Sequence, residues 1–173
     1  MDEIKIPLSK SKIGLLLIAA LLFVVFGFWT VITPQRFVSP RFSESMVLVA
    51  GIVAILFFGL CAIFIAKKVF SKKFGLVIND MGIIDNSGAT SVGLIEWADI
   101  TGMSKLEIAS SKILMIYTSD AEKYINRARN KIAKKAMAAN HKMYGSPLSI
   151  TSNSLKIKFS ELELLLAEQI EKR

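Results

Sequence analysis

Two long stretches of the chain consist of uncharged, mostly apolar positions. Ile13 to Gln35 contains no Asp, Glu, Lys or Arg, and neither does Ser45 to Ala66. A helix rises about 1.5 Å per residue, so helices over 13–33 and 45–66 would be roughly 32 and 33 Å long, enough to cross a hydrocarbon core of about 30 Å. Neither stretch shows the one-sided polarity of a surface helix. The pattern predicts two transmembrane helices, 13–33 and 45–66, joined by an external loop, 34–44.

Lysines and arginines concentrate on one side of these predicted spans. Loop 34–44 contains only Arg36 and Arg41, whereas the other flanks, 1–12 and 67–73, contain Lys5, Lys10, Lys12, Lys67, Lys68, Lys72 and Lys73. Because positive residues stay on the cytoplasmic side of a membrane, both termini are predicted to be cytoplasmic and the protein to lie in the inner membrane. A cleaved signal peptide is the alternative for the first stretch, but the apolar run is longer than usual and no small-x-small cleavage site follows it.

Small residues mark one face of the second predicted span. Gly51, Gly59, Ala62 and Ala66 fall near one another at helical spacing, and small side chains let a second helix approach closely. The partner helix could belong to the same chain or to a second copy, so a homo-oligomer stays open. Neither span has an ionisable side chain of the kind that ion or proton pathways require, and a transporter or channel is therefore not indicated.

From Phe74 onward, short apolar runs alternate with turn residues, which is typical of antiparallel strands. The predicted five-strand meander occupies 74–78, 83–85, 91–96, 100–108 and 113–118. Asp80 falls in one turn and Asp85 directly precedes the next, and these acids are interpreted as turn residues, not metal ligands. Two shorter strands are predicted at 148–151 and 155–158, followed by a C-terminal helix with an apolar stripe whose capping box begins at Ser160.

Three segments carry a resemblance to a known family: Gly75 to Asn86, Ile95 to Ile100 and Tyr144 to Ile150. With these segments, the chain resembles a bacterial family of small, uncharacterised two-span membrane proteins with a cytoplasmic pleckstrin-homology-like (PH-like) domain. The resemblance implies an α+β membrane protein, with a transmembrane hairpin followed by a PH-like antiparallel β domain over 74–173 and a C-terminal helix. It brings no catalytic motif, and the helical insertion after the fifth strand departs from a plain PH-like layout.

This inserted segment, Ala121 to Gly145, is strongly basic. It contains seven Lys or Arg residues against one acid, Glu122, and it predicts one amphipathic helix with Asp120 as its N-cap. The predicted apolar face consists of Ile125, Ala128, Ile132, Ala136, Ala139 and Met143. Three interpretations compete for the cations: contact with the anionic inner leaflet, a merely solvated face, or nucleic acid, for which no base-stacking aromatic platform is present.

The lipid interpretation is the preferred one, and it assigns a set of lipid-binding residues. They are Lys67, Lys68, Lys72, Lys73, Lys123, Arg127, Lys131, Lys134 and Lys135. The segment 121–145 carries a charge of +6, whereas the rest of residues 74–173 carries −4, so the positive charge of this domain is concentrated in the inserted segment.

No residues are predicted to be catalytic, cofactor-binding or metal-binding. One cysteine, Cys61, and one histidine, His141, cannot form a His/Cys zinc site within one chain. Strand alternation is expected to scatter Glu96, Asp99 and Glu107, and Trp97 is expected in the core, with stacking on a ligand as the alternative.

The sequence therefore predicts a non-enzymatic membrane protein that presents a PH-like module to anionic lipid headgroups, a protein partner or both, with no cofactor. Nucleic acid is not an expected partner. The alternative is a membrane-tethered enzyme, or a subunit, whose site is completed by an oligomer or a partner.

Overall fold

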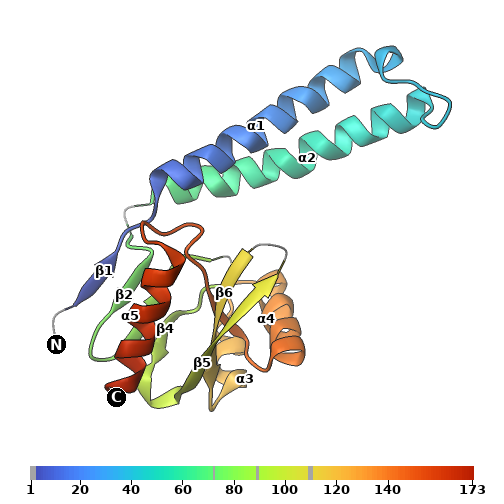
Figure 1. The fold of residues 1–173 in the computed structure, drawn as a ribbon. Helices are drawn as coiled ribbons and strands as arrows, with labels where there is room; N and C mark the ends of the chain where they lie inside the picture. Colours follow the sequence, from blue (N-terminus) through green and yellow to red (C-terminus); the bar gives the residue numbers. More distant parts are fainter. Residues whose placement is uncertain (1–2, 72, 89, 109–110) are drawn as a thin grey trace. The chain divides into compact units, whose positions relative to one another are not determined.

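The computed structural model describes residues 3–71, 73–88, 90–108 and 111–173, and the chain forms two compact units (Figure 1). One unit, which begins at Lys10, is helical. The other, which we call the module, combines the segment that ends at Ser9 with the chain from Lys73 to Arg173. The module is therefore built from residues on both sides of the helical unit.

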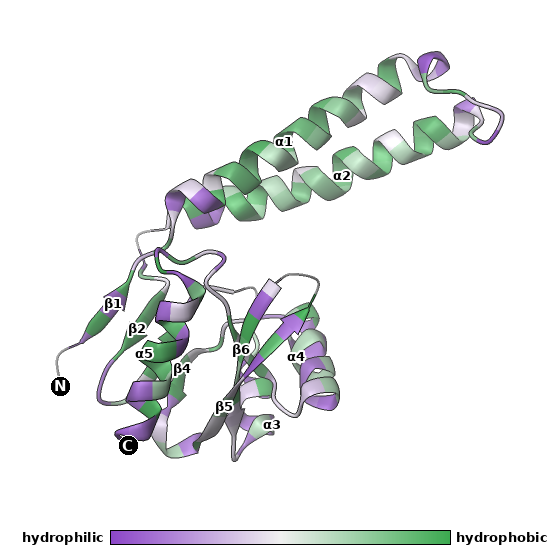
Figure 2. Ribbon diagram, viewed as in Figure 1, coloured by the Kyte–Doolittle hydropathy of each residue, from purple (hydrophilic) through white to green (hydrophobic). Residues whose placement is uncertain are grey.

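The helical unit contains the two predicted spans. Helix α1 covers Lys10–Ile32, helix α2 covers Glu44–Val69, and a short 3-10 helix, η1 (Pro34–Arg36), follows α1. The Ser43 side chain caps α2 by accepting a hydrogen bond from the Met46 amide. Both helices are long and apolar enough to cross a membrane, by length and composition. Figure 2 shows that their hydrophilic residues lie mainly at the helix ends.

Two glycines allow α1 and α2 to approach closely. A Cβ atom on Gly51 would lie 2.4 Å from Thr30 Oγ1 and 3.1 Å from the Gly27 carbonyl oxygen, so no side chain fits there. Among the four small residues predicted to share a contact, Gly51 and Ala62 are buried, whereas a Cβ on Gly59 would meet open space. Gly51 thus serves packing within the chain.

The module contains two antiparallel sheets, ordered β1-β2-β3-β4 and β5-β6-β7. Their strands are β1 (Ile4–Ile6), β2 (Leu76–Ile78), β3 (Gly82–Asp85), β4 (Gly93–Glu96), β5 (Ile100–Ile108), β6 (Ser111–Thr118) and β7 (Leu148–Ile150). The predicted strand positions are confirmed, except that 155–158 forms only an isolated bridge between Leu155 and Leu8. A single five-strand meander is wrong, because the 3-10 helix η2 (Trp97–Asp99) separates β4 from β5 and the chain changes sheets there.

Strand β1 precedes α1 in the chain, yet it is an edge strand of the module. It pairs with β2, with Ile6 opposite Leu76. Beyond the strand, the Ser9 amide donates a hydrogen bond to the Ser154 carbonyl oxygen at 2.8 Å. The sequence pattern does not predict this strand. Residues 1–12 were expected only to flank the first apolar span.

The predicted basic helix over 121–145 is in fact two helices. Helix α3 covers Ala121–Asn126 and helix α4 covers Lys131–Tyr144. Asp120 is confirmed as the N-cap of α3, since its carboxylate accepts a hydrogen bond from the Lys123 amide. Asn130 caps α4 in the same way, accepting from the Ala133 amide at 2.8 Å, and this second cap starts a new helix.

The break between α3 and α4 changes which side chains are buried. Ile125 is buried as predicted, but in α4 the buried residues are Ala133 and Met137. Ile132 is 82% exposed and Met143 is 62% exposed. The predicted apolar face is therefore wrong for α4. Because the helix is interrupted between α3 and α4, the side of α4 that faces the core does not follow from the buried side of α3.

Both sheets and all three module helices contribute to the core. Helix α5 (Phe159–Glu171) contributes Leu162 and Leu166, two residues of the module's buried core cluster. The cap of α5 is Lys158 and not Ser160, since the Lys158 amide donates to Glu161 Oε2. The predicted apolar stripe of this helix is thus confirmed, and its predicted start is two residues late.

Trp97 packs against this core only in part. It lies in η2 instead of on a strand, and its indole N–H donates to the Asn79 carbonyl oxygen at 2.7 Å. The Arg173 guanidinium lies 5.2 Å from the ring centroid, within the range of a cation–π contact. The indole is therefore satisfied by groups of the module itself.

Candidate functional site

The predicted lipid-binding cations occupy different parts of the structure. Lys67 and Lys68 lie in the last turn of α2, where positive charge complements the carbonyl end of a helix. Lys73 belongs to the module, and Lys72 lies outside the described residues. The remaining five lie in α3, in α4 and at the start of the turn between them.

Three of these five, Lys131, Lys134 and Lys135, are exposed on α4, and Lys142 lies exposed on the same helix. No acidic residue occurs within α4, and within the described part of the chain none of these four lysines forms an ion pair. Lys134 donates to the neutral side chain of Asn126, so its charge is not compensated either. The four lysines make α4 a cationic surface.

Exposed apolar side chains adjoin these lysines. At about 100° per residue, Ile132, Ala139 and Met143 fall in one sector of α4, next to the sector that holds the lysines. All three are exposed. We call the two sectors together the outward face of α4; it consists of Lys131, Ile132, Lys134, Lys135, Ala139, Lys142 and Met143.

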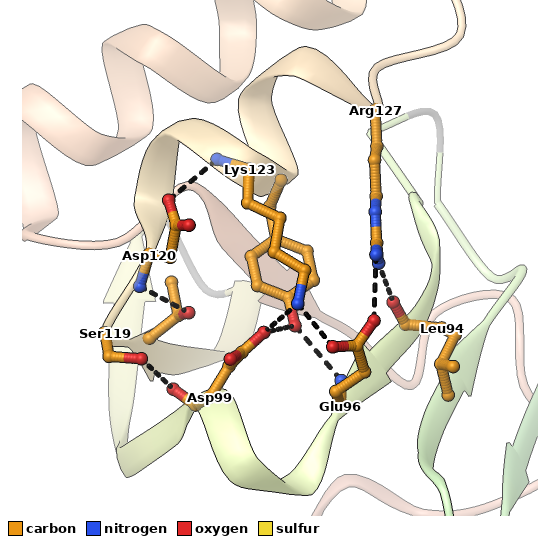
Figure 3. A network of polar contacts seen from close by, with 9 residues as sticks. Leu94, Glu96, Asp99, Ser119, Asp120, Lys123 and Arg127 are labelled. Atoms are coloured by element: carbon orange, nitrogen blue, oxygen red, sulfur yellow. Dashed lines mark hydrogen bonds and ion pairs between the residues drawn. The ribbon is translucent and has the colours of Figure 1, made fainter.

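Lys123 and Arg127, in contrast, form internal ion pairs, as Figure 3 shows. The Lys123 ammonium contacts Glu96 and lies 2.6 Å from Asp99 Oδ2. The Arg127 guanidinium lies 2.8 Å from Glu96 Oε1 and 3.1 Å from the Leu94 carbonyl oxygen. We call these contacts the ion-pair network. The two cations are held by groups of the module and are not part of the outward face of α4.

The expectation that Glu96 and Asp99 are scattered is wrong. The chain leaves β4 after Glu96 and forms η2, which ends at Asp99. In a 3-10 helix, side chains three residues apart point in the same direction, and both carboxylates therefore reach Lys123. Glu107 lies exposed on β5, and it takes no part in the ion-pair network.

Tyr124 supports the ion-pair network from the core. Its side chain is fully buried, and its hydroxyl donates to Asp99 Oδ2 at 2.6 Å. The same hydroxyl accepts a hydrogen bond from the Glu96 amide at 3.1 Å. The network therefore fixes α3 to the turn that joins the two sheets, and each titratable group in it has another as its partner.

These contacts move the pKa values of the network in consistent directions. Hydrogen bonds from Lys123 lower the pKa of Glu96 and of Asp99, with Arg127 and Tyr124 adding to the effect on one carboxylate each. The hydrogen bonds to the two carboxylates raise the pKa of Lys123. Burial, helped by the bond to Asp99, raises the pKa of Tyr124 to about 12. At neutral pH the network is thus held in its paired state.

We expect the stability of the module to fall at both ends of the pH range. Carboxylates with lowered pKa values stabilise the fold above their unfolded pKa of about 4, and this stabilisation is lost as the pH falls through their folded values. Lys123 and Tyr124 have raised pKa values, so their contribution is complete below about pH 10 and is lost as the pH rises further. The urea midpoint of the full chain in detergent, followed by Trp97 fluorescence with Trp29 replaced by phenylalanine, measures this.

Lys123→Met provides the decisive variant, because it removes the common partner of both carboxylates. Both the acid and the alkaline losses should become smaller in this variant. Lys112→Met, which changes an exposed lysine of β6, should leave them unchanged. Unaltered pH dependence in Lys123→Met would contradict the role given to the network.

Other polar groups of the module have structural roles. The buried Asp85 carboxylate accepts hydrogen bonds from the Ser87 and Ser91 hydroxyls at 2.6 and 2.5 Å; Asp85 is the last residue of β3, and its side chain holds the turn that follows the strand. Within the described residues, no group of three His, Cys, Asp or Glu side chains could hold a metal ion. A hollow of about 340 Å³ is lined by Trp97, Ala98, Ile100, Ile170 and Arg173, and only one of these side chains is charged.

The chain has been compared with protein families, with curated proteins and with solved structures. None of them matches. The resemblance to two-span PH-like proteins thus rests on the sequence segments alone. The features of the chain that bear on its function are the two helices, the outward face of α4 and the topology of the module.

Proposed function

We propose that this chain is a non-enzymatic protein of the inner membrane that crosses the bilayer twice and presents a PH-like binding module at the cytoplasmic face. The module contacts anionic lipid headgroups, a protein partner or both. The pairing of β1 with β2 carries this proposal, because the two strands lie on opposite sides of the apolar helices in the chain.

This pairing restricts how the helices can cross a membrane. β1 and β2 belong to one sheet, so the chain must leave and return on the same side of the bilayer. Two crossings by α1 and α2 satisfy this condition, and a single crossing does not. Cleavage after α1 would also separate β1 from its sheet, which favours a retained first helix over a signal peptide.

The exposed apolar surface of α1 and α2 supports insertion in lipid. Large side chains along both helices are exposed, among them Leu15 at 69%, Leu56 at 68% and Phe64 at 63%. Soluble proteins rarely expose continuous apolar patches of more than a few hundred Å², and a core helix would be mostly buried. A bilayer would cover these side chains, and helical structure satisfies the backbone within it.

The distribution of charge and the topology of the sheets support the orientation and the fold class. The seven lysines in 1–12 and 67–73, at the two ends of the helix pair that are joined to the module in sequence, outnumber the two arginines in loop 34–44, which favours a cytoplasmic module. Sheets of four and three antiparallel strands, with a C-terminal helix packed on the core, support a PH-like module. The acids and bases that converge in the ion-pair network neutralise one another. This pairing agrees with a binding role better than with an enzymatic one.

Cysteine labelling of the full chain tests the topology. Cys61→Ala provides a background without cysteine, to which Ser39→Cys in the loop between the helices or Asn153→Cys in the module is added. An impermeant maleimide should label position 39 in intact spheroplasts and position 153 only after lysis. The reverse pattern would overturn the orientation, and release of the intact chain by alkaline carbonate would overturn membrane insertion itself.

A further inference from the structure

Helix α4 has an outward face for which the fold of the module provides no partner. We propose that this face lies in the interfacial region of an anionic phospholipid bilayer, with Ile132 and Met143 inserted beside the headgroups and the neighbouring lysines on the phosphates. This inference rests on the proposed function, because the helical unit is what brings the module to a membrane.

The apolar part of this face is a stripe. Ile132, Ala139 and Met143 follow the spacing i, i+7 and i+11 of one side of a helix, and half-buried Ala136 continues this line at the edge of the face. A single exposed aliphatic side chain is ordinary on a protein surface. Here, however, the two large residues are 82% and 62% exposed and lie along the same line, with exposed Ala139 between them. Such a line is typical of helices that lie in the plane of a membrane interface.

The charged part of the face indicates which kind of partner binds to it. Lys131, Lys135 and Lys142 border the stripe, Lys134 lies at the far edge of the lysine sector, and α4 contains no acid. Lysine stems cover apolar surface while their ammonium groups remain at headgroup level, and anionic lipids attract such clusters. A specific protein interface buries about 800 Å² on each partner, far more than two large side chains offer, so a lipid surface fits this face better than a protein.

Because a short segment of chain connects the module to the helical unit, even a low affinity of α4 for lipid is sufficient to hold this helix at the bilayer. Three residues, 7–9, separate β1 from α1, so the chain can extend at most about 14 Å between Ile6 and Lys10. A tether of this length gives the module a high effective concentration at the bilayer. Insertion of α4 then needs little affinity of its own, and its role is to orient the module at the surface.

A fluorescent label at position 132 tests the proposal in the full chain. Ile132→Cys in the Cys61→Ala background is labelled with an environment-sensitive dye and reconstituted in nanodiscs. One disc contains phosphatidylcholine alone, and the other also contains phosphatidylglycerol; both carry a lipid quencher placed near the headgroups. We expect a blue shift and quenching of the label in the anionic disc, with a much smaller change in the neutral disc.

Leu164→Cys provides the matched control, since Leu164 is a 71% exposed leucine on another module helix, α5. Its label should remain in water in both discs. Combined glutamine substitution of Lys131, Lys134, Lys135 and Lys142 should abolish the quenching at position 132 in anionic discs.

Two results would overturn the inference. A label at position 132 that stays in water in both discs would leave the face for a protein partner, and equal quenching in both discs would contradict the role of the lysines. Failure of the proposed function would be distinct, because carbonate would then release the chain and it would not enter the discs as an integral protein.

Discussion

Ile6→Asp is expected to unfold the module, although this residue precedes both apolar helices. Ile6 is only 6% exposed and lies in β1 opposite Leu76, which is fully buried. The substitution removes about 2 kcal/mol of apolar burial and places an unpaired carboxylate in the core, which costs several kcal/mol more. Since domains are stable by about 5–15 kcal/mol, a loss of about 4 kcal/mol or more populates the unfolded module.

The neighbouring backbone adds to this effect. The Gly75 amide donates to the Ile6 carbonyl oxygen and the Lys156 amide donates to the Pro7 carbonyl oxygen, both at 2.9 Å. If β1 leaves the sheet, these amides lose their partners, and the edge of β2 becomes exposed. A fragment that begins at residue 74 lacks β1 for the same reason, so it is not a faithful substitute for the module.

Pulse proteolysis of the full chain in detergent, over a series of urea concentrations, measures the expected loss. Lys5→Asp is the matched control, because Lys5 lies in the same strand with a side chain that is 45% exposed. We expect this control to change the stability by less than about 1 kcal/mol. If Ile6→Asp resisted proteolysis as well as the unchanged chain, β1 would not be part of the module.

The features that local patterns determine could be predicted from the sequence. The two apolar helices, the strands from β2 to β7 and the apolar stripe of α5 each follow from a run of residues with one period. β1 could not be predicted in this way, because it has three residues and its partner lies beyond both apolar helices, with Ile4 opposite Ile78. Nothing in its local pattern distinguishes it from an irregular flank.

Two short breaks in regular secondary structure determine the candidate site, and sequence periodicity did not predict either of them. Treating Ala121 to Gly145 as one helix assigned Ile132 and Met143 to the same apolar face as Ile125, which is buried. The signal for the break was Asn130, a good N-cap residue in the middle of the basic segment. Likewise, three residues of η2 replaced the alternation of a strand and brought Glu96 and Asp99 together at Lys123.

Gly82→Ala is expected to disrupt the module through a single methyl group. A Cβ atom at this position would lie 2.0 Å from the carbonyl oxygen of Ile95 and 3.0 Å from the Glu96 Cα. Both contacts are with backbone, so no side-chain rotation relieves them. Gly82 also has a φ of +156°, which residues with a Cβ rarely adopt. β3 and β4 would have to separate where Gly82 pairs with Glu96.

The consequences of that separation extend in two directions, because Ile95 is buried in the core and Glu96 pairs with Lys123 and Arg127. We expect a loss of about 3 kcal/mol or more in the free energy of unfolding, measured from urea midpoints. Gly102→Ala is the control: a Cβ on Gly102, in β5, meets nothing within 4 Å, and alanine there should be neutral or slightly stabilising. Equal stability of the two variants would mean that β3 and β4 do not pair at Gly82, and the ion-pair network would then lose the strand that positions Glu96.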